Sequence, residues 1–426
     1  MKNRYLLLLI CSLCAYSTFS QTSPEWLVYD GTPTAGRFDD IFFINDSTGW
    51  AVSSDGEIYK TMNAGVTWQL KFSEATYFRS VEFFDTEVGF AGTLFGNLYK
   101  TEDGGNTWND IGDLLPHVFT GICGLSVADD STIYACGIWS SPAYIFKSTN
   151  RGETWTYTDM SDKAYSLVDI KFTDKNHGFA TGQAADLTQG GIILYTTDGG
   201  ANWTTKITTG HPNDYVWKIQ LLDGVHAFGA IADVTGTGTT RFLKSLDNGD
   251  SWEVKLIDET YTYIEMIGFA NPDTGWTGSY DILETTDGGD SWHPADWGYN
   301  INRFFQVNNN LNFASGASIY VYTDTAYVPV DTTTGITNLN QQHSIISINP
   351  NPASTTLQIE LEISNLTTVD LSIFDMKGIK QIEINHGIVQ PGKYNISQTI
   401  NLTPGEYILC LHSNEGLRWK RLTVVK

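Results

Sequence analysis

Short runs in which apolar and polar residues alternate recur along the first three quarters of the chain. Each run predicts a β-strand that turns one face toward a core. The runs are residues 40–44, 80–84, 124–128, 169–173, 218–222 and 266–270. Nine positions after the first core residue of each run stands an aromatic residue: Trp50, Phe90, Tyr134, Phe179, Phe228 and Trp276. This spacing predicts a second strand that returns antiparallel to the first.

A third apolar strand in each unit ends in an octapeptide that combines a hydroxyl, an acid or amide, a glycine and a tryptophan. The six copies are TMNAGVTW from Thr61, TEDGGNTW from Thr101, STNRGETW from Ser148, TTDGGANW from Thr196, SLDNGDSW from Ser245 and TTDGGDSW from Thr285. Successive copies are 40, 47, 48, 49 and 40 residues apart. A repeat of this length is typical of a four-stranded propeller blade, with the octapeptide as the turn into the fourth strand.

A seventh unit lacks the octapeptide. Residues 303–307 match a first strand, Phe313 stands in a second strand and residues 318–324 match a third. Trp26 stands 15 residues before Ile41, and the octapeptide tryptophans precede the next first strand by 13 to 17 residues. The N-terminal strand is therefore predicted to complete the last blade. We predict an all-β chain with a seven-bladed β-propeller over residues 21–327.

The polar residue and the tryptophan of each octapeptide have separate predicted tasks. The acid or amide accepts hydrogen bonds from the backbone of the turn, and it is Asn63, Asp103, Asn150, Asp198, Asp247 or Asp287. The tryptophan packs on the sheet, and it is Trp68, Trp108, Trp155, Trp203, Trp252 or Trp292. Burial of one indole stabilises a fold by up to about 4–6 kcal/mol, whereas one hydrogen bond contributes about 1 kcal/mol.

The octapeptide closely resembles the Asp box, also called the bacterial neuraminidase repeat. In families that carry this repeat the box is a structural turn away from the active site, and the resemblance implies the same role here. A calcium loop is the alternative for the acidic copies DNGD and DGGD. Such a loop needs several carboxylates at alternating positions and a bidentate acid at its end, which none of the six copies supplies. We therefore predict no metal and no cofactor.

The first 20 residues predict a signal peptide. Lys2 and Arg4 give a basic start, and residues 5–16 form an apolar run that is too short to span a bilayer. Small residues before position 21 suit a cleavage site. A lipoprotein signal at Cys11 or Cys14 is the weaker alternative, because neither cysteine follows the usual small residue.

A polar linker is predicted over residues 328–342, and residues 343–426 predict a small immunoglobulin-like β-sandwich. Four segments of this region closely resemble the C-terminal sorting domain of the Bacteroidetes type IX secretion system. They are residues 349–357, 371–378, 402–409 and 420–426. The resemblance implies that the export machinery is a partner and that the protein is secreted or held at the cell surface. An adhesion module of the immunoglobulin type is the alternative.

Negative charge is concentrated in the predicted propeller. The chain has 25 basic and 48 acidic residues, a net charge of −23. The signal peptide holds two bases and residues 343–426 hold seven of each sign, which leaves 16 bases and 41 acids in residues 21–342. A net charge of −25 repels nucleic acids and anionic membranes at long range, so a nucleic acid is not a predicted partner. No apolar stretch after the signal peptide is long enough for a membrane helix, so no membrane span is predicted.

Three cysteines follow the predicted signal peptide: Cys123, Cys136 and Cys410. This number is too small for a disulfide framework. Cys123 and Cys136 fall on successive strands of one hairpin, so one bridge and two buried thiols are both compatible with the sequence.

The end of the propeller opposite the octapeptides is the predicted binding face. Loops between second and third strands meet the connections between blades there, and these loops are longest in blades 4 and 5. Alignment of the first strands places one residue of each blade at the channel mouth: Asp39, Arg79, Cys123, Val168, Trp217, Glu265 and Arg303. The charged members alternate in sign, which is compatible with a ring of ion pairs or with a ligand site.

The ligand-site hypothesis divides the mouth into two parts. Arg79, Arg303 and the nearby Arg37 are candidates to bind an anionic or polar group, since arginine pairs with carboxylates through two hydrogen bonds. The aromatic candidates for a stacking surface are Trp139, Tyr215 and Trp217.

Two families of glycoside hydrolases with Asp boxes supply the catalytic alternative. Sialidases need an arginine triad, but the predicted propeller has five arginines and Arg151 lies inside an octapeptide. Xyloglucan hydrolases need two carboxylates across a cleft, and Glu265 with Asp39 is the one rim pair that the alignment offers. Arginine neighbours would lower the pKa of these carboxyls, which disfavours an acid catalyst.

The blade pattern is more similar to the photosystem II stability and assembly factor family. The resemblance covers residues 25–328 and implies a seven-bladed propeller without known catalysis that binds proteins. The sorting signal argues against a photosynthetic role. We therefore predict an exported, non-catalytic propeller that binds a protein or glycan on its loop-rich face, with a carbohydrate-active hydrolase as the alternative.

Overall fold

The computed structural model divides the chain into two compact units, Met1–Thr333 and Thr334–Lys426. It describes residues 24–137, 143–236, 238–323, 344–363, 367–375, 380–390, 392–413 and 416–425. The predicted signal peptide and linker lie outside the described residues.

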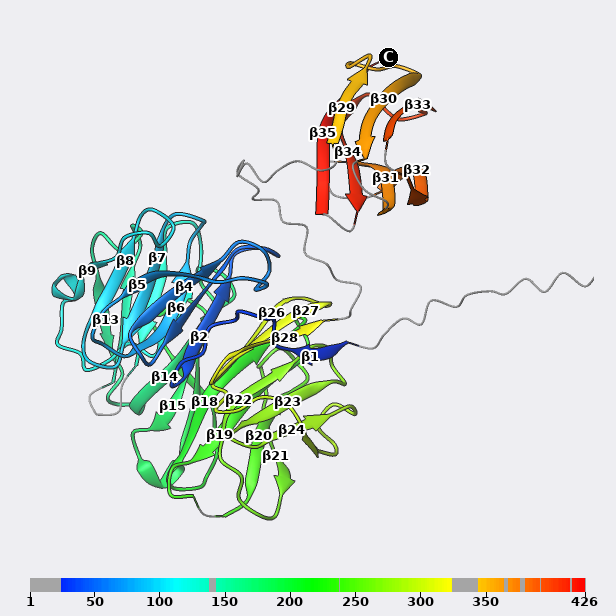
Figure 1. Ribbon diagram of the computed structural model, residues 1–426. Coiled ribbons are helices and arrows are strands. Elements are labelled where there is room, and N and C mark those ends of the chain that lie inside the picture. The colour runs from blue at the N-terminus through cyan, green and yellow to red at the C-terminus, as the bar shows by residue number, and fades with distance from the viewer. Residues whose placement is uncertain are drawn as a thin grey trace, which may run out of the picture. The chain divides into compact units, whose positions relative to one another are not determined.

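Seven four-stranded antiparallel sheets make up the described part of the first unit (Figure 1). Blade 1 contains β2 (Phe38–Phe43), β3 (Gly49–Ser53), β4 (Glu57–Thr61) and β5 (Gln69–Ser73). Blade 2 contains β6 (Phe78–Phe83), β7 (Gly89–Thr93), β8 (Leu98–Thr101) and β9 (Asn109–Asp110). Blade 3 contains β10 (Gly124–Val127), β11 (Ile133–Cys136), β12 (Tyr144–Ser148) and β13 (Thr156–Asp159). Blade 4 contains β14 (Ala164–Phe172), β15 (Gly178–Ala184), β16 (Gly191–Thr196) and β17 (Thr204–Thr208). Blade 5 contains β18 (Asp214–Leu221), β19 (Ala227–Asp233), β20 (Thr240–Ser245) and β21 (Glu253–Asp258). Blade 6 contains β22 (Ile264–Phe269), β23 (Gly275–Ser279), β24 (Ile282–Thr285) and β25 (His293–Ala295). Two short 3-10 turns, η1 (Gly112–Leu114) and η2 (Leu187–Gln189), lie in connecting loops. The predicted all-β propeller is confirmed.

The two ends of the propeller sequence meet in the seventh blade. It contains β26 (Arg303–Asn308), β27 (Leu311–Ser315), β28 (Ile319–Thr323) and the N-terminal strand β1 (Glu25–Leu27). Trp26 lies opposite Tyr322 in the antiparallel β1–β28 pair, and its indole stacks on Trp297 with ring centroids 3.7 Å apart. In Figure 1 the blue strand β1 lies beside the yellow strands. Because β1 covers the edge of β28, the last blade is complete.

The octapeptide tryptophans lie between neighbouring blades. Trp155 of blade 3 packs edge-on against Phe90 of blade 2 with ring centroids 6.0 Å apart. Trp252 of blade 5 contacts Phe179 of blade 4 in the same way at 6.4 Å. Each indole fills space between two twisted sheets, so its burial stabilises the contact between blades as well as its own turn.

The octapeptide turn is closed by its own side chains. In blade 2 the Thr101 hydroxyl accepts the N–H of Gly105 at 2.9 Å and donates to the Asp103 carboxylate at 3.0 Å. This carboxylate also accepts the N–H and the hydroxyl of Thr107, at 2.8 and 2.7 Å. The Trp108 indole N–H donates to the Gly105 carbonyl at 3.1 Å. The acid therefore shapes the turn, and the indole is fixed to it by one further bond.

The glycine at the fifth octapeptide position serves the contact with the preceding blade. Gly152 has a φ of +83°, and a Cβ at this position would lie 2.5 Å from the ring of Phe90. Only glycine tolerates both the positive φ and the close approach. Hydrogen bonds support the equivalent contact between blades 1 and 2, since Lys60 and Trp50 of blade 1 both donate to the Gly104 carbonyl of blade 2, at 2.9 and 3.1 Å.

The described part of the second unit forms two antiparallel sheets around an apolar core. One sheet has the order β29 (Ser344–Asn349), β30 (Thr356–Ile363), β33 (Gly392–Thr399). The other has the order β32 (Lys380–Val389), β31 (Thr367–Asp375), β34 (Gly405–Ser413), β35 (Gly416–Val424). Leu357, Ile359, Leu371 and Leu409 are fully buried in this core, and the predicted small β-sandwich is confirmed.

The cysteines Cys123 and Cys136 form no disulfide bond with each other. Cys123 and Cys136 are buried, and Cys410 is partly buried. Of the two alternatives that the sequence left open for Cys123 and Cys136, the structure has the pair of buried thiols.

Replacement of Trp108 by alanine should lower the free energy of unfolding by about 3–5 kcal/mol, because it leaves a cavity between two blades. The change Asp103→Ala should cost only about 1–2 kcal/mol, because it removes turn hydrogen bonds near the surface. Urea unfolding of the exported chain, followed by circular dichroism, measures both losses. Equal losses would show that the carboxylate contributes as much as the indole.

Candidate functional site

The innermost strand of each blade lines the central channel and is bulged near the loop-rich face in most blades. In blades 1, 2, 4, 5 and 6 the register between the first two strands shifts by one residue. The residues skipped by the pairing are Asp39, Arg79, Val168, Trp217 and Glu265, and blade 4 has a second shift that skips Tyr165. A bulge re-aims the side chain of the unpaired residue, and here it directs residues of several blades toward one another.

Four charged residues at the mouth form a set that we call the mouth network: Arg37, Asp39, Arg79 and Glu265. Arg37 lies 2.7 Å from the Asp39 carboxylate and 2.5 Å from the Glu265 carboxylate. Asp39 also pairs with Arg79. Asp39, Arg79 and Glu265 are buried. Two guanidiniums face two carboxylates, so each buried charge has a counter-ion inside the protein.

Hydroxyl and amide groups complete the mouth network. Tyr77 accepts a hydrogen bond from Arg37 at 3.1 Å, and Tyr263 donates to Glu265 at 3.0 Å. Burial raises the pKa of Tyr77 to about 12, so its hydroxyl stays protonated at neutral pH. These tyrosines were missed from the sequence, although each stands two residues before an aligned mouth residue, as Tyr215 does before Trp217.

The two aromatic candidates within the described residues, Tyr215 and Trp217, do not form an open stacking surface. Trp217 and Tyr215 are buried in one apolar cluster, with ring centroids 5.8 Å apart. The Arg79 guanidinium lies 5.6 Å from the Trp217 ring centroid and so reaches from blade 2 to blade 5. The third candidate, Trp139, lies outside the described residues.

Arg303 does not lie at the mouth, and the alignment of blade 7 was one residue out. The register shift of this blade falls between Gln306 and Asn308, so no bulge marks the mouth position. Arg303 is equivalent to Asp40, one level deeper in the channel, and Asn302 takes the mouth position. The sequence could not show this, because a shifted bulge leaves the apolar pattern of the strand unchanged.

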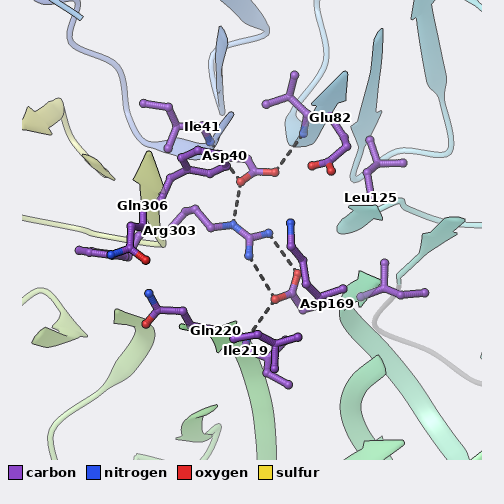
Figure 2. Close-up of a pocket in the computed structure, with 15 residues that line it drawn as sticks. Asp40, Ile41, Glu82, Leu125, Asp169, Ile219, Gln220, Arg303 and Gln306 are labelled. Atoms are coloured by element: carbon purple, nitrogen blue, oxygen red, sulfur yellow. Dashed lines mark hydrogen bonds and ion pairs between the residues drawn. The ribbon is translucent and has the colours of Figure 1, made fainter. Parts of the chain in front are cut away.

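Arg303 crosses the channel and joins a second set, the channel network, made of Asp40, Asp169 and Arg303 (Figure 2). Its Nε donates to Asp40 at 2.7 Å, and its two Nη atoms donate to Asp169 at 3.1 Å each. The carboxylates also accept the backbone N–H groups of Val81 and Ile219, at 3.0 and 3.1 Å. The channel network therefore connects blades 1, 2, 4, 5 and 7.

A cavity of about 170 Å³ lies next to the channel network, and Glu82, Lys171 and Asp169 line it (Figure 2). Burial raises the pKa of Glu82 to about 7. Burial would also raise the pKa of Asp169, but Arg303 and Lys218 hold it below its ordinary value. Burial and the neighbouring Arg303 lower the pKa of Lys218 to about 8. The channel thus holds carboxyls whose environments move their pKa values in opposite directions.

Large apolar side chains are exposed on the loop-rich face, where the connections between blades meet the loops between second and third strands. Phe95 is 71% exposed, Val118 84%, Tyr280 50% and Tyr299 56%. Val28, Leu114, Leu187 and Val234 belong to the same face and are also exposed. Tyr280 and Tyr299 contact each other, with ring centroids 5.5 Å apart. Exposed apolar groups of this kind commonly mark interaction surfaces.

No group of three or more His, Cys, Asp or Glu side chains within the described residues is arranged to hold a metal ion. In the same residues no helix has the length and apolar character that a membrane crossing needs.

Comparison with protein families matches residues 347–426 to the secretion system C-terminal sorting domain. This match indicates delivery by the type IX secretion system, so the protein is secreted or displayed at the cell surface. Comparison with curated proteins gives no significant match.

Several solved structures share the propeller fold. YCF48 bound to D1 peptide has a TM-score of 0.54 and 16% identity over 71% of this chain and 98% of that one. YCF48 from Cyanidioschyzon merolae has a TM-score of 0.53 and 17% identity over 70% and 98%. The GH74 xyloglucanase from Xanthomonas campestris has a TM-score of 0.52 and 10% identity over 80% and 59%. At these identities the likeness establishes the fold alone.

The change Arg303→Met should destabilise the propeller by about 3–5 kcal/mol, because it removes the guanidinium that pairs with the buried carboxylates of Asp40 and Asp169. The control Arg151→Met breaks a more exposed pair with Asp85 and should cost at most about 1 kcal/mol. Urea unfolding of the exported chain measures both. If both variants lost equally little, the channel network would not hold the blades together.

Glu82 should make the propeller less stable as the pH rises. Its pKa of about 7 lies above the ordinary 4.5. Between these two pH values the folded state holds a proton that the unfolded state has released, so the free energy of unfolding falls as the pH rises through this range. In Glu82→Gln this part of the pH dependence, up to about 3 kcal/mol, should disappear. Urea midpoints of both proteins at pH 4.5 and 7.5 test the sign. An unchanged pH profile in the variant would contradict the assignment.

Proposed function

We propose that this chain is an exported, non-catalytic binding protein whose propeller holds a protein partner on its loop-rich face. Residues 1–20 act as the signal peptide, residues 328–342 as the linker and residues 343–426 as the sorting domain read by the type IX machinery. The six octapeptides act as Asp boxes, which build the scaffold on the opposite face. The ligand therefore contacts the loops and not the repeats.

The exposed apolar residues of the loop-rich face carry this proposal. Phe95, Val118, Tyr280 and Tyr299 are at least half exposed there, while Arg37 and Arg79 of the mouth are already paired with carboxylates. A ligand that approaches this face thus meets exposed apolar and aromatic side chains, whereas the arginines of the mouth are already engaged. Tyrosine, phenylalanine and other large apolar groups are the usual anchors of protein interfaces.

The solved structures support the same choice without deciding it. One propeller of this fold is described as bound to D1 peptide, and another is a xyloglucanase. Both a polypeptide and a polysaccharide are therefore compatible with the fold, and the choice rests on the surface of this chain. Its exposed groups include several large apolar side chains, which suit a polypeptide partner better than a sugar chain.

One observation supports a catalytic role for the cavity, and two observations argue against it. Glu82 and Asp169 line the same cavity with pKa values shifted in opposite directions, as in an acid and base pair. However, Asp169 is bound by both Nη atoms of Arg303 and by the Ile219 N–H. The cavity also lies within the channel and away from the loop-rich face. We therefore propose binding in place of hydrolysis.

Capture of partners from cell-surface extract by the tagged, exported chain tests the proposal. The pair Tyr280→Ala and Tyr299→Ala should reduce the captured protein at least about fivefold, because it removes contact area on the loop-rich face. The matched control pair Val225→Ala and Leu246→Ala removes exposed apolar groups from the octapeptide face and should leave capture unchanged.

Equal loss in both pairs, or no protein that depends on the tyrosines, would overturn the proposed binding face. Hydrolysis of xyloglucan or of a fluorogenic sialoside that disappears in Glu82→Gln would overturn the non-catalytic part. A glycan array that binds the chain through the tyrosines would replace the protein by a glycan.

A further inference from the structure

The loop-rich face is strongly acidic as well as apolar. Its described connections and loops carry exposed acids from every side of the ring: Asp30, Asp55, Glu74, Asp113, Asp162, Asp186, Glu259, Asp281 and Asp296. The same described segments contain one arginine, Arg37, and one lysine, Lys163. Because acids outnumber bases on this face, they create a negative potential over the whole of it.

The two bases on this face do not offset that potential. Arg37 is engaged by Asp39 and Glu265 inside the mouth network, and Lys163 pairs with its neighbour Asp162. The lysines of the propeller gather instead near the octapeptides, where Lys60 donates to the Gly104 carbonyl and Lys147 to the Gly199 carbonyl. Apart from Asp162, the exposed acids of the loop-rich face have no lysine or arginine partner among the described residues, so they can pair with a basic group of an external partner.

A groove on this face places acidic and apolar groups side by side. It lies between the β7–β8 loop and the connection from β9 to β10, and its lining includes Asn97, Asp110, Asp113, His117, Val118 and Phe119. Its volume is about 410 Å³, within the range of ligand sites. Phe95 stands on the β7–β8 loop and Val118 on the connection, so both exposed side chains belong to the segments that form the groove.

The carboxylates of the groove differ in what they already bind. Asp110 accepts the Gly112 N–H at 2.9 Å and the Asn97 amide at 2.6 Å, so it shapes the groove. Asp113 is exposed and has no side-chain bond to another described residue. A cation at this position would meet Asp113 directly and would still lie close to apolar surface.

We propose that this groove binds a basic, amphipathic segment of a partner protein. Lysine or arginine side chains of the segment pair with Asp113 and Asp110, while its apolar side chains cover Phe95 and Val118. This inference rests on the proposed function, because it assigns a chemical class to the partner of the same face.

The charge of the face argues against other occupants. A second copy of the chain would bring one acidic loop-rich face against another, and like charges in contact are destabilising. An acidic polysaccharide or an anionic membrane would be repelled in the same way. A basic segment gains from the field at a distance and from apolar contact once bound, so its association should weaken as salt rises.

Binding of labelled synthetic octapeptides to the exported chain tests the proposal by fluorescence anisotropy. The probe (Lys-Phe)4 carries both required features, whereas (Glu-Phe)4 reverses the charge and (Lys-Ser)4 removes the apolar groups. The first should bind at least about tenfold more tightly than either of the others. Its affinity should fall when NaCl is raised from about 50 to about 300 mM.

Single changes on the exported chain locate the site. Asp113→Asn should weaken (Lys-Phe)4 about two- to fivefold, as expected for an exposed ion pair, and the pair Phe95→Ser and Val118→Ser about tenfold. The matched control Asp130→Asn neutralises an exposed acid on an octapeptide-face turn and should change nothing.

Equal effects of Asp113→Asn and Asp130→Asn would overturn the groove, because they would show only general attraction to an acidic protein. Equal binding of (Lys-Phe)4 and (Glu-Phe)4 would overturn the basic partner. Failure here is distinguishable from failure of the proposed function. If the surface partner is still captured through Tyr280 and Tyr299 but ignores salt and Asp113→Asn, the binding face stands and the partner class is wrong.

Discussion

Twisted sheets arranged in a circle must each contact two neighbours, and in this protein the octapeptide turn makes that contact. The turn presents a glycine to an aromatic ring of the preceding blade, where a Cβ on Gly152 would lie 2.5 Å from Phe90. The following tryptophan fills the remaining space between the sheets. Because the same joint recurs from blade to blade, the ring is held at its periphery, and the opposite face is free to vary in loop length and chemistry.

The centre of the ring is held by charge. Bulges in the innermost strands direct Asp39, Arg79 and Glu265 toward one mouth, and Arg303 crosses the channel to Asp40 and Asp169. Buried charges of this kind are costly unless they are paired, and in both networks they are. These arginines are therefore engaged within the scaffold, and the proposed binding face is formed by the loops above them.

The two ends of the propeller therefore differ in chemistry. The octapeptide end gathers lysines that donate to backbone carbonyls of the next blade, as Lys60 and Lys147 do. The loop-rich end has exposed acids together with Phe95 and Val118. An exported protein meets its partners in solution or on a surface, and an acidic, partly apolar face is suited to partners of opposite charge. The sorting region supplies the route of export.

The sequence by itself determined the repeat, the seven blades and the roles within the octapeptide. All of these follow from local spacing, because alternation, turn residues and tryptophan positions are set within about 50 residues of one another. The mouth residues of blades 1, 2, 5 and 6 were also found by alignment, since Asp39, Arg79, Trp217 and Glu265 occupy equivalent places.

Only the tertiary structure decided what those residues contact. The level of Arg303 depends on where a bulge falls. The partners of Asp169 are Arg303 of blade 7, across the channel, and the Ile219 N–H of the neighbouring blade 5. The contact of the Arg79 guanidinium with the Trp217 ring likewise joins residues more than 100 positions apart in the chain. A single sequence records which side chains are present at each level of the ring, but distances across the channel arise only when the ring closes.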